Sequence, residues 1–236
     1  MKGMAWCAGV FAAVLAVGLP ASAARADLAG CDLPKVDGFV ALVDQSGSMY
    51  EPHAEAGEVK EVLAKRVLLQ INEEVPSQFC CMTSALYLFA PFEEVKPPYI
   101  HDEASFATRI GWIPDSQPIA LRLTPMADGL EELSPVVSGM KGKTAIIMIS
   151  DGEANSGGDP VEAARALVAA KPGTCLHVVS IADSDHGREV NKALAQITPE
   201  CRSVEALEIM GNGPKVQQFA RDVFCKARPP AARRGG

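Results

Sequence analysis

Four short apolar runs, separated by longer segments of helical pattern, constrain the fold of this chain more than any other feature. They stand at residues 39–43 (FVALV), 85–89 (ALYLF), 145–149 (AIIMI) and 176–181 (LHVVSI). Because these runs are mostly apolar and do not strictly alternate with polar residues, they predict strands that are covered on both faces, as in a parallel sheet. A weaker strand is expected at 204–209.

The segments between the runs predict helices. Residues 55–75 place their apolar side chains near one face and their charges on the other, the apolar set being Val59, Val62, Leu63, Val67 and Ile71. Further helices are expected at 128–137, 160–170, 189–197 and 215–224. Asp159 before Pro160 supplies a capping carboxylate and a proline at the first helical position. This alternation predicts one three-layer α/β domain with right-handed crossovers, while 92–123 shows no legible period.

The N-terminus has the composition of a secretory signal peptide. Lys2 is followed by a short apolar run at 9–19 and then by small residues in an A-x-A arrangement. The run is too short to cross a bilayer, which takes about 20 apolar residues, and no later segment approaches that length. We expect a signal peptide over residues 1–23, with cleavage after Ala26 as the alternative.

Residues 28–31 (LAGC) have the form of a lipobox, in which Cys31 would be lipidated. Arg25 and Asp27 separate this box from the apolar run, and charges there would disturb insertion. Loss of Cys7 with the signal leaves an even number of cysteines, as expected for an exported chain with disulfides, whereas lipidation would leave an odd number. We therefore expect a soluble protein that is periplasmic or secreted, with a lipoprotein anchored at Cys31 as the alternative.

The charge balance excludes one class of partner. The chain has 29 acidic and 22 basic side chains, a formal charge of −7, which argues against binding to a nucleic-acid backbone. The basic residues that do cluster lie at the C-terminus, in a segment rich in proline and glycine that predicts disorder. We assign residues 24–35 to a linker, 36–226 to the domain and 227–236 to a disordered basic tail.

Carboxylate and hydroxyl side chains follow two of the predicted strands. Asp44, Ser46 and Ser48 come directly after the first, at a spacing that lets all three turn to one side of an extended loop, and Gly47 allows the backbone to bend between them. Asp151 follows the strand at 145–149. In an open parallel sheet, ligands bind outside the carboxyl ends of the strands. A carboxylate with two hydroxyls suits a hard cation such as Mg²⁺, Mn²⁺ or Ca²⁺.

With Thr124, which precedes a predicted helix, these residues resemble the metal-ion-dependent adhesion site of von Willebrand factor A (VWA) domains. The family motif is Asp-x-Ser-x-Ser, followed by a distant Thr and a distant Asp; the matching residues are Asp44, Ser46, Ser48, Thr124 and Asp151. The resemblance covers about residues 36–225. It implies a doubly wound, mostly parallel six-stranded sheet of order 3-2-1-4-5-6 with one antiparallel edge strand.

The resemblance also implies a function. In such sites the two Ser hydroxyls bind the metal directly, the Asp and Thr side chains bind directly or through water, and an acidic side chain of a protein partner fills the open position. The expected protein is therefore a binding module and not an enzyme, with Mg²⁺ as its cation and Mn²⁺ or Ca²⁺ as alternatives. Two other functions stay open: a metal-dependent hydrolase, for which His53 or Glu153 would have to act as base, and a structural scaffold without metal. The simpler expectation for His53 is an exposed loop residue.

A cysteine pairing follows from the same resemblance. If the family strand order holds, Cys175 and Cys201 begin neighbouring strands and pair, and a Cys31–Cys225 bond would join the ends of the domain as in some family members. This leaves the adjacent pair Cys80–Cys81. In a strand these two side chains would point to opposite faces, so a bond between them would be strained. The connectivity stays open at this stage, because six cysteines allow many pairings.

Overall fold

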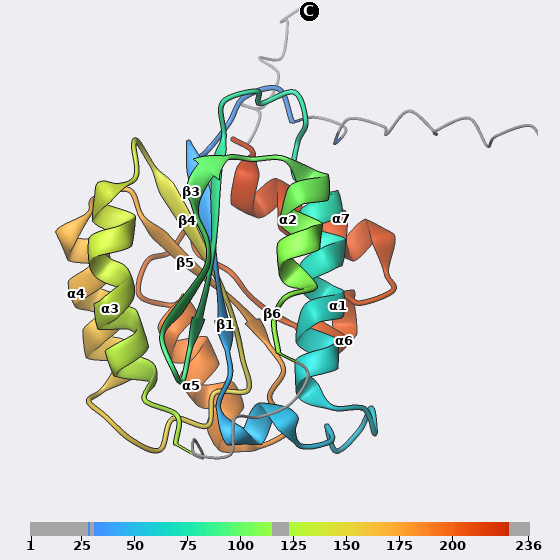
Figure 1. The fold of residues 1–236 in the computed structure, drawn as a ribbon, viewed down its shortest axis with the longest axis vertical. Coiled ribbons are helices and arrows are strands. Elements are labelled where there is room, and N and C mark those ends of the chain that lie inside the picture. The colour runs from blue at the N-terminus through green and yellow to red at the C-terminus, as the bar shows by residue number, and fades with distance from the viewer. Residues whose placement is uncertain (1–27, 29–30, 115–122, 227–236) are drawn as a thin grey trace, which may run out of the picture.

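The computed structural model describes Leu28, residues 31–114 and residues 123–226. The predicted signal peptide, part of the predicted linker and the predicted basic tail lie outside the described residues. Within them, a six-stranded sheet is covered by helices on both faces (Figure 1). No helix in this part of the chain combines the length and the apolar character that crossing a membrane requires.

The sheet has the topology that the resemblance implied. Its strands run in the spatial order β3-β2-β1-β4-β5-β6, and their bounds are β1 Gly38–Asp44, β2 Thr83–Phe89, β3 Glu93–Ile100, β4 Thr144–Ser150, β5 Cys175–Ser180 and β6 Ser203–Glu205. Every neighbouring pair is parallel except β2 with β3, which is antiparallel. β1 is paired with β2 on one side and β4 on the other, so the carboxyl end of β1 lies where the strand order reverses.

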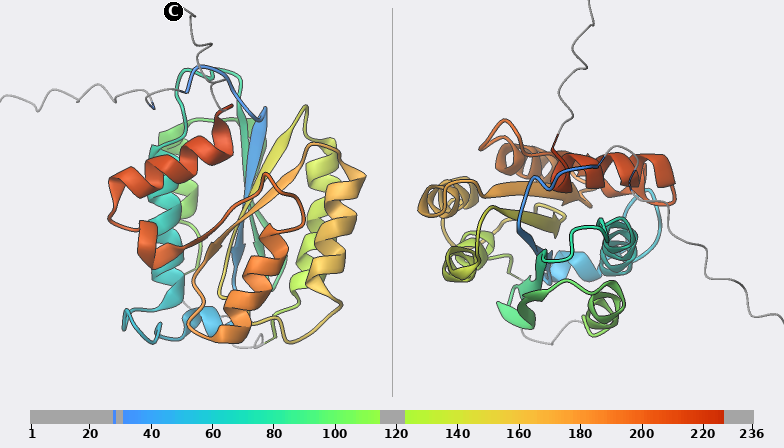
Figure 2. Two further views of the ribbon diagram at one scale, coloured as in Figure 1. Left: turned by 180° about the vertical axis from the view of Figure 1, so that it is seen from behind. Right: turned by 90° about the horizontal axis from the view of Figure 1, so that it is seen from above.

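Alternate side chains of β1 enter two separate cores. Phe39, Ala41 and Val43 pack with one set of helices, α1 (Lys60–Glu73), α2 (Glu103–Ile110), α6 (Ala206–Ile209) and α7 (Gly213–Phe224). Val40 and Leu42 pack on the other face with α3 (Met126–Gly139), α4 (Pro160–Ala170) and α5 (Asp185–Ala195). Figure 2 shows the sheet between these two layers. Burial on both faces explains why β1 is apolar from Phe39 to Val43.

The first helix starts later than expected. The periodicity predicted a helix over 55–75, but α1 begins at Lys60. The His53 ring explains the difference, because its Nδ1 accepts hydrogen bonds from the backbone N–H groups of Glu55 (3.2 Å) and Ala56 (3.3 Å) and so stabilises a turn in place of a helix. Its side chain is buried, so the expectation of an exposed loop histidine was wrong.

Three other details differ from the predictions. The strand expected at 204–209 is shorter, because α6 begins directly after β6, and a hydrogen bond from the Met210 N–H to the Ala206 carbonyl closes its turn at 2.8 Å. Val62, expected on the apolar face of its helix, is exposed. The illegible region 92–123 contains β3 and α2.

β3 is the antiparallel edge strand, as the resemblance implied. Its two prolines, Pro97 and Pro98, lie where the register with β2 shifts between the pairs Ser84–Tyr99 and Leu86–Lys96, so neither is required to donate a ladder hydrogen bond.

Two disulfides confirm the cysteine pairing. Cys31 is bonded to Cys225 with Cα atoms 5.2 Å apart, and Cys175 is bonded to Cys201 with Cα atoms 5.5 Å apart. The Lys35 N–H also donates to the Phe224 carbonyl at 2.8 Å, so the two ends of the described domain are joined twice. A Cys31 sulfur that is bonded to Cys225 is not available to a lipid, in keeping with the expected form without lipidation.

Candidate metal centre

Asp44 stands at the carboxyl end of β1 with its carboxylate fully buried. Its Oδ1 accepts a hydrogen bond from the Ser46 N–H at 2.8 Å, and its Oδ2 accepts one from the Ser150 hydroxyl at 2.6 Å. Because Ser150 ends β4, the two bonds fix the carboxylate between the ends of two neighbouring strands.

The two predicted serine ligands converge beside this carboxylate. Ser46 precedes a short 3-10 helix, η1 (Gly47–Tyr50), and its hydroxyl lies 3.2 Å from the hydroxyl of Ser48. Ser46 is fully buried and Ser48 is half-buried, so Ser48 faces the more open side of the cluster. The spacing in the sequence therefore does bring these hydroxyls together.

Asp151, directly after β4, is held by an ion pair that the sequence did not reveal. Its Oδ2 lies 3.1 Å from Lys60 Nζ, and the same ammonium lies 2.7 Å from Oδ1 of Asp183. Asp183 could have been predicted as part of the site, because it is a third acidic residue that follows a strand, here β5. Lys60 could not have been predicted in this way, because a lysine in an amphipathic helical pattern is expected on the exposed face.

Lys60 is a permanent positive charge in this cluster. Burial lowers the pKa of its ammonium, but the hydrogen bond to Asp183 and the charge of Asp151 outweigh that effect, so the pKa lies above its usual value. The single ammonium is shared between two carboxylates.

Thr124 reaches the same edge of the sheet through a neighbouring loop. Its backbone N–H donates to Oδ1 of Asn155 at 2.8 Å, and Asn155 belongs to the loop that follows Asp151. The Thr124 hydroxyl is fully buried, and it neither donates nor accepts a hydrogen bond within the described residues. An unsatisfied buried polar group costs about 1–3 kcal/mol, so this oxygen fits the role of a metal or water ligand.

The charges in the centre also fit a cation. Burial, reinforced by the charge of Asp151, raises the pKa of Asp44 to about 7, although the hydrogen bonds from Ser150 and Ser46 lower it. A divalent ion would reverse this effect. The donors are carboxylate and hydroxyl oxygens, which suit Mg²⁺, Mn²⁺ or Ca²⁺. Over residues 31–114 and 123–226 there is no group of three or more His, Cys, Asp or Glu side chains that could hold a metal, so an ion here would depend on the hydroxyls.

Two glycines let α5 approach the Asp151 loop. Gly152 has a φ of +75°, and a Cβ on Gly187 would lie 2.1 Å from the Asp151 carbonyl oxygen. Behind this contact, the Asn191 side chain donates to the Ser150 carbonyl at 2.9 Å. The position of Asp151 is therefore fixed by the backbone of α5 as well as by Lys60.

Comparison with solved structures shows what kind of fold carries this centre. The vWF domain of the type V pili tip protein Mfa5 from Porphyromonas gingivalis matches 81% of this chain and 97% of its own, with a TM-score of 0.59 and 10% identity. This chain has the VWA fold. No protein-family model matches the sequence, and no curated protein matches it either.

Two further structures share the VWA fold with this chain. An aerotolerance-related membrane protein from Bacteroides fragilis matches with a TM-score of 0.61 and 15% identity, over 79% of this chain and 98% of that one. The manganese-loaded TRAP protein of Plasmodium vivax matches with a TM-score of 0.57 and 16% identity, over 80% of this chain and 74% of that one. At such identities the likeness is one of fold.

The two side chains considered as catalytic bases are engaged elsewhere in this VWA fold. His53 accepts backbone hydrogen bonds through Nδ1, as described above. Glu153 accepts a hydrogen bond from the hydroxyl of Ser184, the residue that caps α5.

Proposed function

We propose that this protein is a metal-dependent protein-binding module of an exported protein. A divalent cation, Mg²⁺ with Mn²⁺ or Ca²⁺ as alternatives, would be held by Asp44, Ser46, Ser48, Thr124 and Asp151, and would bind an Asp or Glu side chain of a protein partner. The observation that carries the proposal is the buried Thr124 hydroxyl without a hydrogen-bond partner at the sheet edge where two buried carboxylates meet.

The balance of charge supports this proposal. Asp44 lies within the electrostatic reach of Asp151, and the single ammonium of Lys60 is shared between Asp151 and Asp183. A divalent ion would supply the positive charge that the cluster lacks. Because three of the five proposed ligands are neutral hydroxyls, such an ion would keep enough positive charge to attract a partner's carboxylate.

The fold neighbours support the same kind of role. Mfa5 is a pilus tip protein, and the TRAP structure is loaded with manganese. Export is in keeping with the two disulfides, because such bonds persist in oxidising compartments such as the periplasm or the cell exterior.

Affinity capture tests the proposal. The immobilised chain is incubated with an envelope extract of its own host in Mg²⁺ and then eluted with EDTA. We expect a protein that binds in Mg²⁺, elutes with EDTA and is lost with Asp44→Ala, but still binds Glu131→Ala, which removes an exposed carboxylate of α3. Equal capture by Asp44→Ala, or capture that EDTA does not reverse, would overturn the proposal.

A further inference from the structure

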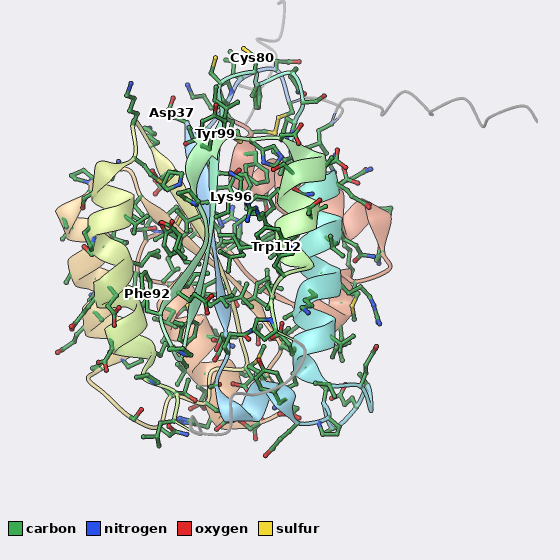
Figure 3. All side chains as sticks on the ribbon, viewed as in Figure 1. Asp37, Cys80, Phe92, Lys96, Tyr99 and Trp112 are labelled. Atoms are coloured by element: carbon green, nitrogen blue, oxygen red, sulfur yellow. A yellow bond between two sulfur atoms is a disulfide. The ribbon has the colours of Figure 1, made fainter. Side chains whose placement is uncertain are left out.

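The adjacent cysteines at 80 and 81 lie at the end of the molecule opposite the candidate metal centre. Figure 3 shows Cys80 at one end of the sheet, whereas η1 lies at the other in Figure 1. Both thiols are exposed, and every other cysteine of the described residues is in a disulfide. These two thiols have no part in the proposed metal site.

The two sulfur atoms point toward each other. Cys80 and Cys81 are the central residues of a β-turn that is closed by a hydrogen bond from the Met82 N–H to the Phe79 carbonyl at 3.1 Å. Their Sγ atoms are 3.4 Å apart. The expectation that the side chains point to opposite faces holds for a strand and was wrong here, because β2 begins only after the turn.

The turn is held in place on both sides. Met82 is buried, and Phe79 packs against the core on the side of the sheet where α1 lies. The Gln78 side chain donates to the Cys31 carbonyl at 2.9 Å. The two thiols are therefore kept near each other before any reaction, which favours an intramolecular step over a bimolecular one.

A small cleft adjoins the pair. It has a volume of about 200 Å³ and is lined by both cysteines together with Pro34, Val36 and Phe79. Its walls are mainly apolar side chains, so a small organic molecule can rest beside the sulfur atoms.

We propose that Cys80 and Cys81 form a thiol–disulfide exchange site that takes small organic disulfides as substrates and closes as a disulfide between neighbouring residues. One cysteine thiolate attacks a substrate sulfur, forms a mixed disulfide and releases the first substrate thiolate. The second thiolate then attacks the mixed disulfide at the cysteine sulfur and releases the other. Two electrons pass from the cysteines to the substrate bond, and the two protons that the cysteines lose are taken up by the released thiolates.

The two thiols also influence each other's ionisation. The hydrogen bond with Cys80 and the charge of that group raise the pKa of Cys81.

Geometry makes the product bond reversible. The Cα atoms of adjacent residues are about 3.8 Å apart across a trans peptide, below the usual disulfide range of about 4.4–6.8 Å. Such a bond is strained and is reduced more readily than an ordinary disulfide. The two disulfides of the fold have Cα separations of 5.2 and 5.5 Å, inside the usual range. The pair is therefore the redox-active one.

The test uses the chromogenic disulfide of thionitrobenzoate on the full chain carrying Cys7→Ser, with the two structural disulfides intact. We expect both halves of the reagent to be released, no adduct to remain by intact mass, and peptide mapping to place the new bond between residues 80 and 81. In Cys81→Ser we expect one half to be released and the other to stay on Cys80. Chains that keep an adduct on each cysteine, or that become linked to one another, would overturn the proposal.

Reversal provides a second measurement. In a titration with dithiothreitol, the 80–81 bond is expected to open before the Cys31–Cys225 and Cys175–Cys201 bonds. Reduction of all three disulfides together would contradict the inference that the 80–81 bond is strained. EDTA should leave both measurements unchanged, so the outcome is independent of the proposed metal site.

Discussion

At the scale of single residues, Lys60 holds the unexpected position in the candidate centre. Its ammonium contacts Asp151 and Asp183 and is only 5% exposed. Removing one partner of a buried ion pair leaves an uncompensated charge, which costs about 3–5 kcal/mol. Lys60 therefore acts as the resident counter-ion of Asp151 and stabilises the centre when no metal is bound.

This role gives a prediction for Lys60→Met, which keeps the length of the side chain and removes its charge. In EDTA we expect the free energy of unfolding to fall by about 3–5 kcal/mol, and Mg²⁺ to restore more stability than it adds to the wild type. Urea denaturation with EDTA or Mg²⁺ measures both effects. Lys192→Met, at an exposed position of α5, is the matched control. A Lys60→Met protein as stable as the wild type in EDTA would contradict this role.

Gly187 gives a second prediction at this scale. In Gly187→Ala the new Cβ meets the Asp151 carbonyl oxygen, so the loop that carries Asp151 must move. We expect a loss of about 1–3 kcal/mol in stability together with weaker Mg²⁺ binding. Gly139→Ala, where a Cβ meets nothing within 4 Å, should change neither quantity much. Thermal unfolding and calorimetry would decide, and unchanged metal binding in Gly187→Ala would refute the proposed backbone support.

At the scale of elements, the carboxyl ends of β1, β4 and β5 supply the acidic residues of the centre, and β5 also carries a buried histidine. Burial lowers the pKa of His177 to about 3, with help from the charges of Lys35 and Arg202. Its Nδ1 accepts a hydrogen bond from the Arg202 N–H at 3.1 Å. The ring is therefore neutral in the fold and structural.

This histidine makes stability depend on pH. In the unfolded chain the His177 ring is protonated below its usual pKa of about 6.5, whereas in the folded chain it stays neutral. His177 therefore lowers the free energy of unfolding by about 1.4 kcal/mol for each pH unit below that value, and has no such effect above it. We expect His177→Gln to flatten the fall in unfolding free energy from about pH 6 to about pH 4. Urea titrations at several pH values measure the slope. His186→Gln, at an exposed site, should leave the slope unchanged, and the same slope in both variants would contradict the effect.

The elements also show how far sequence could go. The four apolar runs predicted β1, β2, β4 and β5 because strands buried on both faces leave a continuous apolar record. β3 escaped notice because it is an exposed edge strand that contains prolines. The late start of α1 depends on hydrogen bonds to the His53 ring, and the periodicity of apolar residues gives no information about such bonds.

The candidate site divides in the same way. Asp44, Ser46 and Ser48 are adjacent in the chain, so their spacing predicted their convergence. Lys60 depends on the packing of α1 against the ends of β4 and β5, so its place is decided by tertiary contacts. Cys80 and Cys81 converge because a turn replaced the strand on which the prediction relied.

At the scale of the whole molecule, the Cys31–Cys225 bond closes almost the entire domain into one loop. Its sequence separation is 194, against 26 for Cys175–Cys201. In the chain-entropy view, the longer loop stabilises the fold by about 5 kcal/mol and the shorter one by about 3.5 kcal/mol. We expect the Cys31→Ser, Cys225→Ser double variant to lose more stability in urea than the Cys175→Ser, Cys201→Ser double variant. The opposite ranking would contradict this view.

The most direct measurement is a calorimetric titration of Mg²⁺ into the metal-free chain, into Asp44→Ala and into Glu131→Ala. We predict saturable binding by the wild type and by Glu131→Ala, and no binding by Asp44→Ala with an unchanged far-ultraviolet circular dichroism spectrum. Absence of binding by the wild type, or equal binding by Asp44→Ala, would contradict a divalent-cation site at the carboxyl end of β1.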